Sequence, residues 1–199
     1  MGLETEVKIY LLDPNQISAK LSQLGAHQSK ARVFERNIRY ENADNTLTQR
    51  EIVLRLRQDD RARLTYKEPT TAHESLDMRT RLELETEVAD FDTMHTILQH
   101  LGFHEHMVYE KYRTTYEMND AEIVLDEMPF GNFIEVEGEP DAIESVIKAL
   151  ELTSSGRIIV SYVVLFDLIK SALGLSFRDL TFTNFEGITV PDFLLQSLR

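Results

Sequence analysis

The chain has 199 residues, of which 42% are hydrophobic, and its formal net charge is -13. This is enough apolar material for one domain with a buried core, and an acidic chain without a long basic run is not a binder of duplex DNA or RNA. The chain has no cysteine, which excludes a disulfide framework and a thiolate metal site.

Two further absences set the expected location and organisation of the protein. Charged residues begin at Glu4 and no apolar run reaches the length of a membrane span. We therefore expect a cytoplasmic protein with no signal peptide and no membrane partner. No break in composition suggests a boundary, so we expect a single domain over residues 1–199.

The first half of the chain predicts several strands and one helix. Asp13-Pro14 opens the helix, with aspartate as the N-cap and proline at the first helical position, and Gly25 suits its end. Alternating side chains predict the strands, and turn residues separate them at 42–45 and 59–60. The predicted strands cover residues 3–11, 32–41, 52–58, 63–67 and 79–88, with a loop at 69–74.

The second half predicts a helix from Asp90 to Gly102, then strands, then two more helices. His104 and His106 could chelate a metal on a strand, but after a helix-ending glycine we expect a solvated loop. The last 25 residues are too apolar for a free tail, so we expect them to pack on the outside of the domain or on a second subunit of a homodimer. The predicted strands are 109–117, 121–127 and 132–138, and the helices are 140–151 and 161–173.

Residues 3–7 and 84–88 have the same sequence, Leu-Glu-Thr-Glu-Val. Each copy precedes a predicted helix that ends in Leu-Gly. We interpret the two copies as related strand–helix units.

Charged residues at a spacing of two recur on these strands. Glu4, Glu6 and Lys8 share one face of the first strand, because successive side chains of a strand point to opposite faces. Same-sign pairs lie on separate strands, as in Arg55-x-Arg57 and Glu135-x-Glu137. On a solvated sheet face we would expect acidic and basic side chains to be mixed. The pattern therefore favours an α+β fold in which a sheet closes into a barrel with a charged interior.

These motifs together resemble the CYTH superfamily, also called triphosphate tunnel metalloenzymes. Glu4-x-Glu6-x-Lys8 is the first match, and further matches follow in the family's order from about residue 2 to 170, leaving residues 175–199 as a C-terminal extension. The further matches are Leu54-Arg-Leu-Arg57, Leu64-Thr-Tyr-Lys67, Arg81-x-Glu83-x-Glu85, Tyr109-Glu-Lys-Tyr-Arg113, Leu125-Asp126, Gly131-x-Phe133-Ile-Glu135-Val-Glu137 and Ser161-Tyr162.

The resemblance implies a closed eight-stranded antiparallel β-barrel, or tunnel, with helices packed outside. It implies that the tunnel binds a small-molecule triphosphate (tripolyphosphate, ATP or thiamine triphosphate) with Mg²⁺ or Mn²⁺. These hard cations prefer oxygen ligands, and arginine can hold phosphate oxygens bidentately. The implied metal ligands are Glu4, Glu6, Glu83, Glu85, Asp126, Glu135 and Glu137. The implied triphosphate-binding residues are Lys8, Arg55, Arg57, Lys67, Lys111 and Arg113.

The leading hypothesis is a metal-dependent phosphohydrolase in which one carboxylate, Glu4, Glu6 or Glu135, orients water. Lys8 or Lys111 would help to polarise the reacting phosphate groups. A class IV adenylyl cyclase, which forms cyclic AMP and pyrophosphate, is the alternative. A polyphosphate-binding module without catalysis is the second alternative. Many relatives carry an acidic residue and a tyrosine where this chain has Asn37. The flanking Arg36 and Arg39 could reach the tunnel mouth or face solvent.

Overall fold

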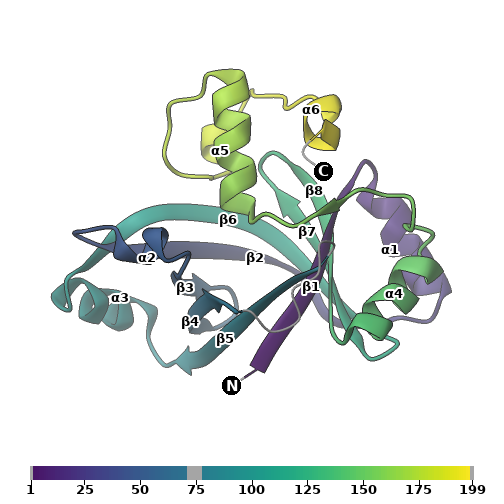
Figure 1. Ribbon diagram of the computed structural model, residues 1–199, viewed down its shortest axis with the longest axis horizontal. Helices are drawn as coiled ribbons and strands as arrows, with labels where there is room; N and C mark the ends of the chain where they lie inside the picture. Colours follow the sequence, from purple (N-terminus) through teal and green to yellow (C-terminus); the bar gives the residue numbers. More distant parts are fainter. Residues whose placement is uncertain (1, 71–77, 198–199) are drawn as a thin grey trace.

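The computed structural model, which describes residues 2–70 and 78–197, forms a ring of strands with helices outside it (Figure 1). The predicted α+β fold class is confirmed. The ring order is β5-β4-β3-β2-β6-β7-β8-β1, all pairs are antiparallel, and β1 pairs again with β5 and so closes the ring. The strands are β1 (Gly2–Leu11), β2 (His27–Asn42), β3 (Val53–Gln58), β4 (Ala62–Pro69), β5 (Arg79–Val88), β6 (Phe103–Met118), β7 (Ala121–Met128) and β8 (Gly131–Glu137).

β1 closes the ring with both of its edges. One edge pairs with β8 from Glu6 to Leu11. The other pairs with β5 from Gly2 to Glu6 and then with the short strand β9 (Arg157–Ile158), opposite Lys8 and Ile9. β9 therefore continues the wall beyond the point where β5 starts, and Lys8 stays within paired sheet.

The apolar core lies outside the ring, between the strands and the helices. Val7 and Ile9 of β1 point outward into a cluster with α1 (Pro14–Gln23) and α4 (Pro140–Ala149). α3 (Phe91–His100) covers a second cluster, and α5 (Tyr162–Leu173) covers a third. Because the apolar side chains of the strands are buried on the outer face, the inner face can carry charged side chains.

The predicted helix starts are confirmed at their caps. Asp13 accepts hydrogen bonds from the backbone N–H groups of Asn15 and Gln16, and Asp90 accepts one from that of Thr93. Ser161 does the same for Val164 at the start of α5. Each cap satisfies a backbone donor that has no partner within its helix.

The C-terminal segment packs on the ring of its own chain, which is one of the two expected outcomes. Leu180 pairs with β6, where its backbone N–H donates to the carbonyl of Val108 and its carbonyl accepts from the N–H of Glu110, each at 2.9 Å. Phe185 of η1 (Thr183–Phe185) and Leu195 of α6 (Asp192–Ser197) are buried in the α5 cluster. The segment thereby covers the part of β6 that β7 does not reach.

Several predicted boundaries are wrong. β2 and β6 begin earlier than predicted, because the two strands pair along nearly their whole lengths, from His27 opposite Glu117 to Asn42 opposite Phe103. His104 and His106 therefore lie on β6 and not in a solvated loop. Pro69 ends β4, and most of the predicted loop at 69–74 falls outside the described residues. The short helix α2 (Thr46–Gln49) and β9 were not predicted.

The described residues contain no helix that is both long and apolar enough to cross a membrane.

Candidate functional site

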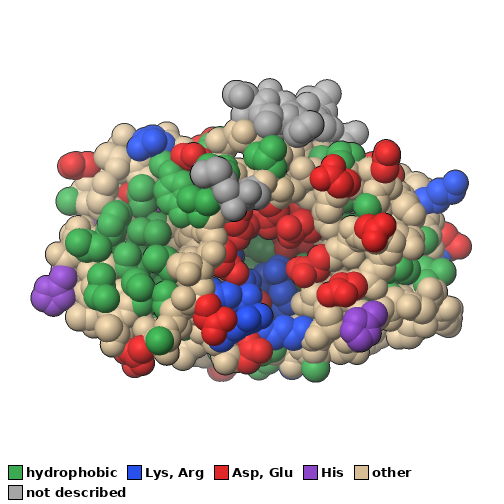
Figure 2. Space-filling model, turned by 90° about the horizontal axis from the view of Figure 1, so that it is seen from below, with side chains coloured by type: hydrophobic (Ala, Val, Ile, Leu, Met, Phe, Trp, Pro, Cys, Tyr) green, Lys and Arg blue, Asp and Glu red, His purple; other side chains and the backbone are tan. Residues whose placement is uncertain are grey.

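A cavity of about 630 Å³ occupies the interior of the ring, and charged side chains line it. Figure 2 shows this hollow with acidic side chains gathered along one side and basic side chains along the other. Apart from Asp126, every predicted site residue lines the cavity. These residues are Glu4, Glu6, Lys8, Arg55, Arg57, Lys67, Glu83, Glu85, Lys111, Arg113, Glu135 and Glu137.

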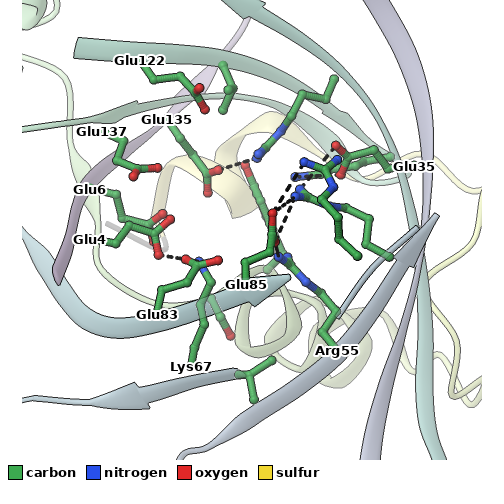
Figure 3. Close-up of a pocket in the computed structure, with 18 of the residues that line it drawn as sticks. Glu4, Glu6, Glu35, Arg55, Lys67, Glu83, Glu85, Glu122, Glu135 and Glu137 are labelled. Carbon is green, nitrogen blue, oxygen red and sulfur yellow. Dashed lines mark hydrogen bonds and ion pairs between the residues drawn. The ribbon is translucent and has the colours of Figure 1, made fainter. Parts of the chain in front are cut away.

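Four carboxylates form what we call the acidic wall: Glu4 and Glu6 of β1, Glu83 of β5 and Glu137 of β8. Figure 3 shows them side by side, facing Arg55 and Glu35 across the cavity. The strand register creates this group, since Glu6 is directly opposite Glu137 and Glu83 is opposite Gly2 near Glu4. Because these neighbouring carboxylates repel one another when charged, ionisation of all four at once is disfavoured.

Protons relieve part of the repulsion within the acidic wall. Burial and a hydrogen bond with Glu4 raise the pKa of Glu83 to about 7. Burial and the charge of Glu4 raise the pKa of Glu137 to about 9. Burial and the charge of Glu135 raise the pKa of Glu6. Glu4 is the exception. Burial acts to raise its pKa, but the hydrogen bond with Glu83 and the charge of Lys67 lower it. Glu4 is therefore ionised at neutral pH, whereas the raised pKa values of its neighbours favour their protonated forms.

The acidic wall has the chemistry of a site for a hard divalent cation. Its oxygen atoms are the ligands that Mg²⁺ and Mn²⁺ prefer. The ammonium group of Lys67 lies between Glu4 and Glu83 and forms ion pairs with both. Within residues 2–70 and 78–197, no three acidic or histidine side chains form a ready-made coordination group. The residues fit a cation that displaces the shared protons and the Lys67 ammonium group.

The opposite side of the cavity is the basic wall, formed by Arg55 and Arg57 of β3 and Lys111 and Arg113 of β6. Carboxylates hold these side chains in place. Glu35 lies 3.6 Å from both Arg57 and Lys111, and Glu85 lies 3.2 Å from Arg57. The basic side chains are thus fixed before any ligand arrives, which reduces the entropy cost of binding.

Asp126 and Glu85 are carboxylates that pair with the cations of the basic wall and do not lie in the acidic wall. Asp126 is buried and accepts hydrogen bonds from Arg113 at 2.6 Å, from Lys111 at 3.0 Å and from the hydroxyl of Tyr162 at 2.9 Å. Burial acts to raise the pKa of Asp126, but the charges of Arg113 and Lys111 lower it. Its surroundings favour a role in positioning these two cations over the implied role as a metal ligand, and the contacts of Glu85 with Arg57 do the same.

The two lysines with implied catalytic roles converge on Tyr162 at the start of α5. The Lys8 ammonium group lies 4.3 Å from the centre of the Tyr162 ring, and that of Lys111 lies 5.6 Å from it. Lys8 also lies 3.2 Å from Glu135 and donates to the Val160 carbonyl at 3.1 Å. α5 therefore fixes one end of the basic wall from outside the ring.

Glu35 is a buried charged residue of the cavity that the sequence analysis missed. It shares the inner face of β2 with Asn37 and Arg39, and the spacing of two between them was the available signal. Asn37 is fully buried, and neither atom of its amide has a hydrogen-bond partner among the described residues. Arg39 reaches the cavity, whereas Arg36 lies outside the ring over Phe91.

The literal internal repeat would align Glu87 with Glu6. Instead, Glu87 pairs with the exposed Arg61, while Glu83 and Glu85 line the cavity. The pattern taken from the family resemblance therefore matches the interior of the ring better than the repeat does.

Comparison with known proteins agrees with this geometry. The CYTH domain family matches residues 2–160. A Methanocaldococcus jannaschii protein provisionally named an adenylate cyclase is 30% identical over 151 residues, which are 75% of this chain and 84% of that protein. A Pyrococcus horikoshii structure with 28% identity and a TM-score of 0.65 covers 82% of this chain and 98% of its own.

A Hippeastrum protein gives a more distant match. Its structure was described as that of a provisional adenylyl cyclase with a dominant triphosphatase activity, and it has 19% identity and a TM-score of 0.60 over 82% of this chain and 95% of its own. At that identity, the likeness shows the fold alone.

Proposed function

Because this chain belongs to the CYTH domain family, we propose that its cavity binds a triphosphate with a divalent metal ion and hydrolyses the terminal phosphate. The observation that carries the proposal is the separation of charge inside one cavity, with the acidic wall facing the basic wall. A metal–triphosphate complex has this same division, since the metal needs carboxylate oxygens and the phosphate oxygens need cations.

The basic wall would bind the phosphate chain. Arg55, Arg57 and Arg113 can each offer two N–H groups to phosphate oxygens. These arginines are now paired with carboxylates. A bound phosphate would either displace those carboxylates or share the arginines with them. Since Glu35, Glu85 and Asp126 already fix the orientation of these cations, the phosphate chain would meet a preorganised surface.

The acidic wall would hold the metal ion, through Glu4, Glu6, Glu83 and Glu137, with Glu135 at its border. When bound, Mg²⁺ or Mn²⁺ would neutralise charge that develops on the phosphate oxygens. Glu135 contacts Lys8 at 3.2 Å and Arg113 at 2.7 Å, so it lies where the two walls meet. That position suits a residue that aligns the phosphate between metal and cations.

Glu4, Lys8 and Lys111 would assist the chemistry. Glu4 stays ionised because its pKa is lowered, so it can accept a hydrogen bond from water and orient it towards the terminal phosphorus. Lys8 and Lys111 are buried, and their charges act strongly on phosphate oxygens in a site with little water. The water oxygen would form a bond to the terminal phosphorus as the bond to the bridging oxygen breaks. The products are orthophosphate and the shortened phosphate chain, and the proton of water passes to the phosphate oxygens or to solvent.

Adenylyl cyclase activity is the second candidate, and the Methanocaldococcus jannaschii relative favours it by name. In that reaction the ribose 3′-hydroxyl attacks the α-phosphorus and pyrophosphate leaves. It requires the nucleoside to be held in line with that phosphorus. The charged cavity residues account for the phosphate chain but identify no set of contacts for adenine, so we rank hydrolysis first.

Product analysis separates the two activities. We would incubate the protein with tripolyphosphate, ATP and thiamine triphosphate, each with Mg²⁺ and with Mn²⁺, and separate the products by chromatography. The hydrolase releases orthophosphate from tripolyphosphate and converts ATP mainly to ADP. Formation of cyclic AMP and pyrophosphate from ATP, with tripolyphosphate untouched, would establish the cyclase instead. Binding without turnover of any substrate would indicate a polyphosphate-binding module.

A further inference from the structure

Besides the basic wall and the ion-paired Arg61 and Arg63, three further arginines line the same cavity. Arg39 comes from β2, and Arg79 and Arg81 come from β5. Arg39 is directly opposite Arg55 in the register of β2 and β3. Residues opposite one another on antiparallel strands have Cβ atoms about 5 Å apart, so Arg39 continues the line of cations that begins with Arg57 and Arg55.

Among the described residues, Arg39, Arg79 and Arg81 differ from the other cations of the cavity in forming no ion pair with a carboxylate. Every cation that the family resemblance implicates forms an ion pair: Lys8, Arg55, Arg57, Lys67, Lys111 and Arg113. In the part of the chain that the structure describes, neither Arg39 nor Arg79 forms one, although Arg79 is opposite Glu6 in register. Arg81 is buried and donates to the backbone carbonyl of Glu51. An anion at this place would not have to displace a carboxylate.

The surroundings of these arginines disfavour their positive charge. Burial lowers the pKa of Arg39, and the like charges of Arg55 and Arg79 add to this effect. Several partly buried cations with mutual repulsion are costly unless an anion joins them.

We propose that Arg39, Arg79 and Arg81 form an additional anion subsite, which holds the next phosphate group of a linear polyphosphate longer than a triphosphate. The subsite deepens the proposed function and rests on it, because the first phosphates must lie on the basic wall for the chain to continue from Arg55 to Arg39. Guanidinium groups suit this ligand, since each can bind phosphate oxygens bidentately. The protein then binds inorganic polyphosphate chains longer than a triphosphate with higher affinity than a triphosphate.

The test compares two inorganic probes in single variants. Titration calorimetry measures the affinities of tetraphosphate and tripolyphosphate for the native protein, Arg39→Gln and Arg79→Gln, in EDTA and again with Ca²⁺. Loss of a charge-assisted contact to the fourth phosphate lowers the ratio of tetraphosphate to tripolyphosphate affinity by roughly tenfold in each variant. Arg36→Gln is the matched control, because it removes an arginine from the outer face of the same strand and keeps the native ratio.

The outcomes separate this subsite from the proposed function. An unchanged ratio in both variants overturns the subsite, and so does an equal fall in both affinities, which would assign the arginines to the triphosphate site itself. Failure of the native protein to bind either probe overturns the proposed function together with the subsite. Thermal melts check that the variants fold. The two arginines are on different strands and Arg81 is left intact, so a defect in one variant leaves the other as the test.

Discussion

Glu137 and Asp126 are both carboxylates of the ring, yet their pKa values move in opposite directions. Glu137 is next to other carboxylates, and burial together with the charge of Glu4 raises its pKa to about 9. Asp126 is enclosed by Arg113 and Lys111, which lower its pKa although burial opposes them. The neighbours of each side chain therefore decide whether it offers its oxygens to a metal ion or positions a cation.

The raised pKa of Glu137 predicts a pH dependence of both metal binding and stability. A raised carboxyl pKa contributes stability at low pH that is lost as the pH rises towards about 9, so the metal-free protein becomes less stable over that range. A metal ion competes with the proton, so its affinity increases over the same range. Thermal melts and Mn²⁺ titrations between pH 6 and 9 measure both effects.

Glu137→Gln is the control for this prediction. It removes a titrating group and part of the repulsion, so we expect a flatter pH dependence of stability, a higher melting temperature at pH 9 without metal, and weaker Mn²⁺ binding. A native Mn²⁺ affinity that does not change with pH would contradict the assignment of the acidic wall.

Arg57 tests the basic wall. Its side chain is 8% exposed and lies between Glu35 and Glu85, whereas that of Arg61 is 51% exposed and pairs with Glu87 at the rim. Arg57→Gln should weaken tripolyphosphate binding by about 2 kcal/mol, or roughly thirtyfold, as expected for a buried charge-assisted contact. Arg61→Gln should leave the affinity unchanged. Equal effects of the two substitutions in titration calorimetry would mean that the phosphate chain does not lie on the basic wall.

Most of the candidate site could be predicted at the residue scale, and the exceptions have a physical reason. Glu4, Glu6 and Lys8 alternate with apolar residues that mark the outer face, so their inward direction is readable from the sequence. On β2 both faces carry charge, with Glu35 and Arg39 on one and Arg36 on the other. Alternation alone does not say which of these faces is inward. Only the pairing of β2 with β3 and β6 decides it.

At the scale of elements, helix caps and alternating strands could be predicted, whereas long polar strand ends could not. The first part of β2 is exposed on both faces, so its sequence has no period-two apolar signal. It is a strand because it pairs with the end of β6, as far as His27 opposite Glu117. β9 is only two residues long and exists because β1 offers a free edge beside Lys8 and Ile9.

The C-terminal segment provides a stability test at this scale. Phe185 is 5% exposed and packs against Phe130, Phe166 and Phe177, while Phe193 is 72% exposed. Phe185→Ala should lower the free energy of unfolding by about 3 to 5 kcal/mol, because it leaves a cavity in the α5 cluster. Phe193→Ala should have little effect. Urea denaturation measures both, and a similar loss for the two variants would mean that the segment is not docked as described.

The whole molecule keeps its apolar core outside the ring and its charges inside. The helices bury the outer faces of the strands in three clusters, and the ring needs no apolar interior to be stable. A net charge of -13 does not prevent the binding of a polyanion, because the cations are gathered within one cavity. Walls of low dielectric concentrate their field there, so the local charge outweighs the overall charge.

The central claim is that one cavity holds a divalent metal on its acidic wall and a triphosphate on its basic wall. A crystal structure with tripolyphosphate and Mn²⁺ tests it most directly, because the anomalous signal of manganese identifies the ion independently of the phosphates. We predict a manganese peak among Glu4, Glu6, Glu83 and Glu137, and phosphate oxygens in contact with Arg55, Arg57 and Arg113. Manganese or tripolyphosphate bound only outside the ring, with the cavity unchanged, would contradict this account.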